Sequence, residues 1–344
     1  MQPDASAERQ TGEARRTRPP AWLVFAALGL LVSVAGLLAP AGIAMTVRTA
    51  VPVVAAVAAV VAVRARRPAV PAAWRLIAAG AVVWTAADLT WAGWYTVTAG
   101  GDAVPLWLGL SYLAAYPLLL AGLGRLPGNG AGTRDAGTTL DAMVILLGMA
   151  FVYWTVYFNP YGGFGALSDQ EVLLAAVYPA ADLVVQFLVL RLWFTHGLRN
   201  PSYAMLALGL VGMFASDVLY ALTYQQGVVW SNGLLENSGW LLWCVLVGAA
   251  ALHPAAAETR ETATEGHLTV ARGVAFLLAA CAGPLSLILT VPSGTAVDPL
   301  DFLTPLAMFA GLMGFLIVRL ITNAGTAQRR ARQLDEQAAE LSRA

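Results

Sequence analysis

The sequence has no lysine and little charge of any kind. Of its 344 residues, 12% are charged and 58% are hydrophobic, and every one of its basic residues is arginine. A water-soluble globular domain carries roughly twice that share of charged residues. The composition therefore excludes an ordinary soluble domain and predicts an all-α integral membrane protein whose main partner is the lipid bilayer.

Motifs that carry chemistry are also scarce. The histidines His196, His253 and His267 are scattered without metal-ligand spacing, and the sequence contains no phosphate-binding loop, nucleophile elbow or zinc motif. Cys244 and Cys281 both lie in apolar runs, which favours buried thiols over a disulfide. We expect no cofactor, no metal site, no catalytic residue within these 344 residues and no nucleic-acid partner.

Long apolar runs recur along most of the chain. A helix needs about 20 apolar residues to cross roughly 30 Å of hydrocarbon. We identify candidate spans at residues 21–39, 48–63, 74–95, 107–126, 139–158, 172–195, 203–224, 234–252, 268–291 and 302–322. The sequence thus predicts about ten transmembrane helices in one domain over 21–322, between a disordered cytoplasmic tail at 1–20 and a cytoplasmic linker helix at 323–344.

The arginines predict the orientation. Cytoplasmic loops are enriched in basic residues, and a cytoplasmic N-terminus places every arginine near the inner face except Arg48. Arg191 and Arg319 would reach that face by snorkelling. Asp141, at the inner end of the fifth span, is expected to cap a helix N-terminus. We expect a multi-pass protein of the plasma (inner) membrane with both termini in the cytoplasm.

Two acidic segments repeat along the chain. "AADLTWAGWY" (86–95) and "ASDVLYALTY" (215–224) align at a spacing of 129 residues, so Asp88 corresponds to Asp217. The segments lie on the third and seventh expected spans, which run in the same direction. The sequence therefore predicts a parallel internal repeat, unlike the inverted repeats of many secondary transporters.

Four expected spans carry an acid beside aromatic residues at helical spacing. A charge at mid-membrane costs roughly 2.5–3.5 kcal/mol on insertion scales, so these acids should face the bundle interior. The candidate binding residues are Asp88, Trp91, Tyr95, Tyr178, Asp182, Asp217, Tyr220, Tyr224, Glu236 and Trp240. Two interpretations stay open: an outward-facing pocket for an unknown polar or cationic small molecule, or hydrogen bonds that only brace the helices.

The last span continues into a polar helical pattern. Leucine or alanine falls every seven residues at Leu320, Ala327, Leu334 and Leu341, and alanine falls four residues after the first three of these. This spacing is the a/d seam of about three heptads. We expect a signal helix that forms a homodimer by a coiled coil; a solvated surface helix is the alternative.

The order of these motifs resembles a known family. The chain carries, in succession, "WRLIAAGAVVWTAADLTW", "SYLAAYPLLLAGL", "TTLDAMVILLGMAFVYW", "YPAADLVVQFLVLRL", "ASDVLYAL" and "SGWLLWCVLVGAAALHP", and then a span that feeds a polar helix. This succession is similar to the multispan sensor region of actinobacterial GGDEF/EAL (cyclic-di-GMP) signalling proteins. The resemblance implies a sensory input module that relays a cue to a diguanylate cyclase or phosphodiesterase domain. The chain contains no GGDEF or EAL motif, so no catalytic residue is carried over.

Two other functions fit the same residues. A small-molecule or proton-coupled transporter would use the acids as carriers, but it would leave the heptad helix without a role. The input module of a histidine kinase would share that helix and differ only in its output domain.

Overall fold

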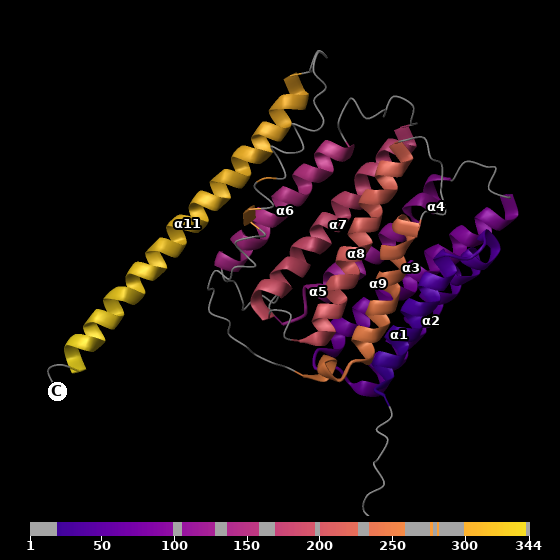
Figure 1. Cartoon of the computed structure of the whole chain (residues 1–344), viewed down its shortest axis with the longest axis horizontal. Helices are drawn as coiled ribbons and strands as arrows, with labels where there is room; N and C mark the ends of the chain where they lie inside the picture. Colours follow the sequence, from indigo (N-terminus) through magenta and orange to yellow (C-terminus); the bar gives the residue numbers. More distant parts are fainter. Residues whose placement is uncertain are drawn as a thin grey trace, which may run out of the picture.

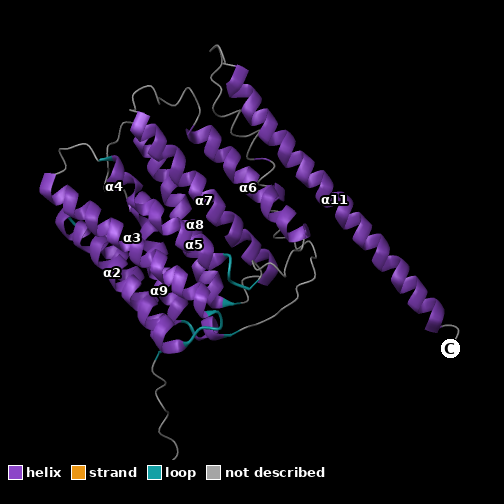
Figure 2. Ribbon diagram, turned by 180° about the vertical axis from the view of Figure 1, so that it is seen from behind, coloured by secondary structure: helices purple, strands orange, loops and turns teal. Residues whose placement is uncertain are grey.

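The computed structural model of the chain describes residues 19–98, 105–127, 136–157, 169–196, 200–225, 234–258, 276–277, 281 and 299–341. Within these ranges all regular structure is helical (Figures 1 and 2). The expected run at 268–291 lies outside the described residues apart from 276–277 and 281, which are helical. The prediction of an all-α fold is confirmed for the described part of the chain.

The helices coincide with the other expected runs. In chain order they are α1 (Ala21–Leu37), α2 (Ala41–Arg66), α3 (Pro71–Thr98), α4 (Leu106–Leu110), the 3₁₀ helix η1 (Ser111–Ala114), α5 (Ala115–Leu123), α6 (Ala136–Tyr157), α7 (Asp169–His196), α8 (Pro201–Gln225), α9 (Leu234–Leu252), the 3₁₀ helix η5 (Pro254–Ala257) and α11 (Pro299–Leu341). Pro117 explains the 3₁₀ turn between α4 and α5, because proline cannot donate to the carbonyl of Leu113 four residues before it.

The chain is a membrane protein. Five helical stretches are long and apolar enough to cross a bilayer: Gly42–Arg66, Pro71–Thr98, Leu106–Leu123, Val177–Phe194 and Pro201–Tyr220. Shorter apolar stretches lie on the remaining long helices, at Ala21–Leu37, Gly137–Phe151, Asn237–Leu252 and Leu306–Thr322. Membrane embedding, as predicted from composition, is therefore confirmed.

Helix α2 shows how these sequences suit lipid and not water. Its large side chains point outward, since Val54, Val57 and Val61 are 57%, 56% and 54% exposed, whereas Ala55 and Ala59 are each 1% exposed. Small residues inside a membrane bundle let helix backbones approach closely, and lipid receives the larger apolar side chains without penalty. The same distribution in water would expose a long apolar stripe.

Six helices form a closed ring. Helix α2 packs against α3, α3 against α5, α5 against α7, α7 against α8, α8 against α9, and α9 against α2. Helix α1 lies outside the ring against α2 and α9, and α6 lies outside it against α7. Helix α11 packs on α6 and its C-terminal half projects beyond the end of the bundle at which α1 begins (Figures 1 and 2).

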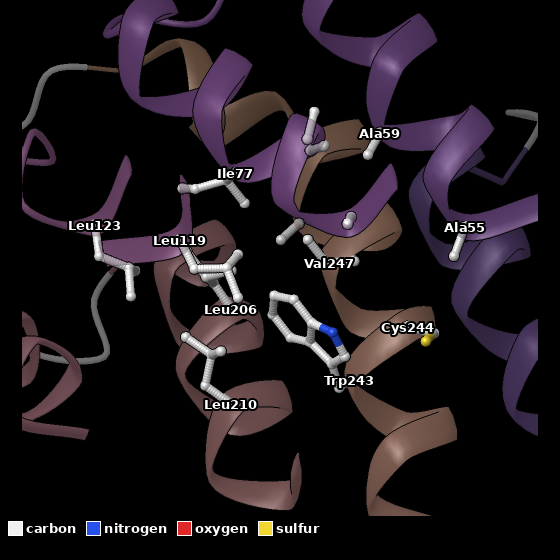
Figure 3. Close-up of a cluster of buried hydrophobic side chains, with 14 of the residues drawn as sticks. Ala55, Ala59, Ile77, Leu119, Leu123, Leu206, Leu210, Trp243, Cys244 and Val247 are labelled. Carbon is white, nitrogen blue, oxygen red and sulfur yellow. The ribbon is translucent and has the colours of Figure 1, made fainter. Parts of the chain in front are cut away.

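The ring is filled by one apolar core. Trp243 of α9 is 1% exposed, and Figure 3 shows its ring beside Leu206 and Leu210 of α8, with Leu119 of α5 close by. Cys244 is a buried free thiol beside this core, whereas Cys281 is free and exposed. Close packing here requires α8 and α9 to cross at small residues, and they do so at Gly212 and Gly239.

The end of α9 is tied to the start of α1. His253 caps η5, since its Nδ1 accepts a hydrogen bond from the Ala255 backbone N–H at 3.1 Å, and its ring lies 4.6 Å from that of Trp22. Partial burial lowers the pKa of His253, which favours the neutral imidazole that can accept this bond.

Candidate functional site

Asp88 of α3 faces the interior and has two partners. The hydroxyl of Tyr112, on η1, donates a hydrogen bond of 2.8 Å to Asp88 Oδ1. Arg48 of α2 lies close enough to attract the Asp88 carboxylate electrostatically. Arg48 is the arginine that the expected orientation leaves far from the inner face, so a counter-charge inside the bundle explains that exception.

Asp182 of α7 and Asp217 of α8 meet inside the ring. Asp182 is 0% exposed, and its Oδ1 accepts a hydrogen bond of 2.7 Å from the hydroxyl of Tyr116 on α5. The carboxyl groups of Asp182 and Asp217 lie close enough to interact electrostatically. The indole Nε1 of Trp240, on α9, donates a bond of 2.9 Å to Asp217 Oδ1. Two acids from neighbouring helices thus form one buried pair.

Aromatic contacts join the two acidic regions. Tyr112 and Tyr116 lie one helical turn apart, and the ring of Trp84 lies 5.1 Å from the first and 6.2 Å from the second. All six ring helices therefore contribute to a polar network, which we define as Arg48, Asp88, Tyr112, Tyr116, Asp182, Asp217 and Trp240. The sequence did not identify Arg48, Tyr112 or Tyr116 as site residues.

The other predicted site residues lie around this network. Trp91 and Tyr95 stack on each other, with ring centroids 5.7 Å apart. Tyr178 donates a hydrogen bond to the backbone carbonyl of Gly109, and its ring lies 6.5 Å from that of Tyr116. Tyr220 packs its ring 5.9 Å from that of Trp240. The side chains of Tyr224 and Glu236 lie outside those that the structure describes.

A cavity in the described part of the chain lies away from the acids. It has a volume of about 320 Å³ and lies between α1, α8 and α9, where it is lined by Leu30, Ser33, Val34, Leu37, Gly212, Ala215, Ser216, Leu219, Ser238, Gly239 and Leu242. Asp88, Asp182 and Asp217 instead each accept a hydrogen bond from an aromatic side chain of a neighbouring span. This arrangement favours the bracing interpretation, and a small-molecule pocket at the acids stays a prediction.

A second polar contact joins α6 to α11. Arg319 makes a bidentate ion pair with Asp141, with Nε bonded to Oδ1 and Nη2 lying 2.8 Å from Oδ2. Asp141 is 0% exposed and Arg319 is 7% exposed. The expectation that Asp141 caps a helix N-terminus is therefore wrong, since its carboxylate pairs with Arg319 more than a turn inside α6. The snorkelling of Arg319 is wrong for the same reason.

Helix α11 runs without interruption through the predicted boundary at 322/323. It is 43 residues long, and Leu320 and Leu334 of the heptad pattern are 66% and 65% exposed. The side chains of Ala327 and Leu341 lie outside those described. Two leucines of the heptad pattern are thus exposed, as are Leu306, Ile317, Val318 and Ile321 of the same helix.

These features define an all-helical membrane protein with a buried polar network and a projecting helix. Among the described residues, no group of three His, Cys, Asp or Glu side chains is placed to hold a metal ion. Comparison with family models, with curated proteins and with solved structures finds no match.

Proposed function

We propose that the chain is the transmembrane sensory input module of a bacterial signalling protein. The observation that carries the proposal is α11, a single 43-residue helix that packs on the bundle with its apolar first half and projects past the bundle with its polar second half (Figure 1). A continuous helix transmits a shift or rotation from one end to the other. Cyclic-di-GMP turnover is the output that the sequence resemblance favours, and a histidine kinase is the alternative.

Helix α6 provides a route from the polar network to α11. One side of α6 packs on α7, where Ala142 contacts a cluster with Leu190 and Phe194. Another side packs on α11, where Val144 and Leu312 are buried in a common cluster. Tyr153 of α6 also interacts electrostatically with Asp182 of α7. Movement of α7 would therefore displace α6. The Asp141–Arg319 pair would transmit this displacement from α6 to α11.

The proposed architecture is a ten-span bundle built on a parallel repeat. Burial in α3 and α8 keeps the same register at the 129-residue spacing. The matched positions, with their exposed fractions, are Trp74/Tyr203 (1% and 3%), Ile77/Leu206 (1% and 0%), Ala81/Leu210 (5% and 0%) and Trp84/Met213 (5% and 0%). The order of packing also repeats, because α2, α3 and α5 occupy one half of the ring and α7, α8 and α9 the other.

The hydrogen bonds to the repeated acids support the same architecture. Asp88 accepts from an aromatic donor 24 residues later in the chain, Tyr112, and Asp217 accepts from one 23 residues later, Trp240. In each half the donor lies on the next span. Helix α1 begins and α11 ends toward the same end of the bundle (Figure 1), which supports our proposal that both termini lie on one side. The arginine distribution favours the cytoplasmic side of the plasma membrane for that end.

The helical phase of α11 tests the proposal. We fuse residues 1–344 to the catalytic domain of a diguanylate cyclase and insert two or seven residues after Gln328. Two residues turn the distal helix by about 200°, whereas seven preserve the heptad seam. We expect the two-residue insertion to change cyclase output strongly and the seven-residue insertion to preserve it. Equal cyclase activity after both insertions would contradict the proposal. Uptake of a small molecule into vesicles driven by a proton or ion gradient would favour the transporter.

Cysteine cross-linking tests the homodimer. In a Cys281→Ser background, Leu334→Cys places a thiol on the heptad seam, and Glu336→Cys places one on the opposite side of the same exposed helix. We expect oxidation in membranes to yield a disulfide-linked dimer for Leu334→Cys and several-fold less for the control, as measured on a non-reducing gel. Equal yields would indicate a solvated helix without a seam.

A further inference from the structure

The cavity between α1, α8 and α9 is a crevice on the lipid-facing side of the bundle. Helices α1 and α8 both pack on α9, and the cavity of about 320 Å³ lies where the three meet. Leu30 and Val34 of its α1 wall are 37% and 53% exposed, and the neighbouring Leu31 is 65% exposed. Exposed leucine and valine on a membrane helix face hydrocarbon. The crevice is therefore reached from the bilayer and not from water.

The three helices give the crevice a defined depth. The ring of Trp22 at the start of α1 lies 4.6 Å from that of His253 after the end of α9. The side-chain amide of Asn200, just before α8, donates a hydrogen bond of 3.1 Å to the carbonyl of Ala255. Helices α1 and α8 thus run in one direction and α9 returns. The lining residues Leu30 and Leu37 of α1 are seven residues apart, so the crevice extends for about 10 Å along the helices.

Ser216 of α8 presents a hydrogen-bond donor in the middle of the crevice. Its side chain is 1% exposed, and its Oγ accepts a bond of 3.0 Å from the Gly239 backbone N–H. No group in the described part of the chain accepts the hydrogen of the Ser216 hydroxyl. Ser33 on the α1 wall differs, because its hydroxyl donates to the carbonyl of Gly29 at 2.7 Å. A buried donor without an acceptor is unfavourable, so the crevice favours a ligand that brings an acceptor.

Depth restricts the kind of acceptor. Helix α9 has 19 residues and is about 28 Å long, close to the roughly 30 Å of the hydrocarbon core. Gly239 lies five residues inside α9, which places the Ser216 hydroxyl about 8 Å below the edge of the hydrocarbon. The ester carbonyls of a phospholipid are fixed beside its headgroup at that edge. A ring ketone instead carries its carbonyl oxygen on an apolar body that enters the hydrocarbon freely.

The volume restricts the size of the ring. An apolar cavity of roughly 150 Å³ binds one benzene molecule, and the 320 Å³ of the crevice is about twice that volume. Two fused six-membered rings therefore suit the space better than one ring. Gly212 and Ala215 of α8 keep this space open, because neither has a side chain larger than a methyl group.

We infer that the crevice binds a lipid-soluble quinone of two fused rings, with a ring carbonyl that accepts a hydrogen bond from the Ser216 hydroxyl. The rings lie between α1 and α8, and the apolar tail of the quinone passes Leu30 and Val34 into the lipid. The ligand enters sideways from the bilayer, which requires no opening of the helix ring. This site goes beyond the proposed function and does not depend on it.

Equilibrium binding to the purified full chain tests the hydrogen bond. The probe is a radiolabelled methylnaphthoquinone with a short isoprenoid tail, in nanodiscs of ether-linked phospholipid, which has no ester carbonyl. We expect saturable binding to the wild type and an affinity for Ser216→Ala that is roughly three- to tenfold weaker, the worth of one hydrogen bond. Ser33→Ala is the matched control, because it removes a lining hydroxyl whose hydrogen is already used, and it should bind like the wild type.

A second pair of variants tests the location. Ala215 is exposed and lines the crevice, so Ala215→Phe fills it and should abolish binding. Val211 is 46% exposed on the same helix and does not belong to the lining, so Val211→Phe should bind like the wild type. A methylnaphthalene with the same tail but no carbonyl gives a test that needs no variant. The wild type should bind it more weakly than the quinone, and Ser216→Ala should bind both probes equally.

Four results would overturn the inference. A wild type without saturable binding has no site, and binding that survives Ala215→Phe lies elsewhere. Equal affinity of the wild type for the quinone and the methylnaphthalene would remove the hydrogen bond to Ser216. Weaker quinone binding in ester-linked than in ether-linked phospholipid would assign the crevice to the phospholipid itself.

Discussion

The substitution Gly239→Ala is expected to lower the yield of folded protein strongly. A Cβ added to Gly239 of α9 would collide with the backbone carbonyl oxygen of Gly212 on α8 and with the hydroxyl of Ser216. A backbone atom of a packed helix cannot rotate away, so α8 and α9 have to move apart, and they carry Asp217 and Trp240. Overpacking of this kind costs about 1–3 kcal/mol or more. The yield of monodisperse protein on size-exclusion chromatography and its Tm measure the loss.

Gly93→Ala is the matched control for this experiment. Gly93 also lies within a helix, α3, but a Cβ at that position would meet nothing within 4 Å. Alanine is favoured over glycine in a helix by roughly 0.5–1 kcal/mol, so the control should match or exceed the wild type in Tm. If Gly239→Ala behaves like Gly93→Ala, the close crossing of α8 and α9 is wrong.

The positions of the helices were largely predictable, because a long apolar run has few alternatives to a membrane-spanning helix. The run expected at 234–252 has the same bounds as α9, Leu234–Leu252. The run expected at 48–63 was too short, since α2 spans Ala41–Arg66. Hydropathy ends the run at Arg48, because an isolated charge in lipid is unfavourable. Its electrostatic partner Asp88 lies 40 residues further along the chain, and hydropathy does not record such pairs.

The acids themselves were predictable, but their partners were only partly so. Asp88, Asp182 and Asp217 face inward as their cost in lipid requires, and Trp240 bonds to Asp217. Helical spacing put Trp91 and Tyr95 on the same stripe as Asp88, yet these rings stack on each other near the exposed end of α3, where Tyr95 is 40% and Val97 is 86% exposed. Helical spacing shows which residues share one face of a helix. It does not show how far the neighbouring helices extend along that face.

The Asp141–Arg319 pair shows the same limit more sharply. The two residues are 178 positions apart, and the sequence relates each of them only to its nearest expected helix end. A bidentate carboxylate–guanidinium pair can satisfy both charges inside the bundle, which makes snorkelling and capping unnecessary. An unaccompanied acid on α6 and an unaccompanied arginine in the apolar stretch Leu306–Thr322 of α11 were the available signal.

Removing one partner of this pair is expected to detach α11 from α6. Asp141→Asn leaves the buried Arg319 guanidinium without its counter-charge, and Arg319→Met does the same to the buried Asp141 carboxylate. Breaking a buried ion pair in this way costs about 3–5 kcal/mol. We expect a large fall in Tm and fast amide hydrogen exchange along the α6–α11 contact, while the α2–α3 contact keeps its protection. Arg332→Met, at an exposed arginine of the same helix, is the control and should change neither measurement.

The double variant Asp141→Leu/Arg319→Met distinguishes an ion pair from general loss of packing. Replacing both charges by apolar side chains removes the unpaired charge and leaves the Val144–Leu312 cluster in place, so stability should return close to that of the wild type. In the cyclase fusion, the single variants should lose their regulated output, because α11 no longer follows α6. Single variants that melt and respond like Arg332→Met would show that α11 is held by apolar contacts alone, and the route from the polar network to the output would then have to run elsewhere.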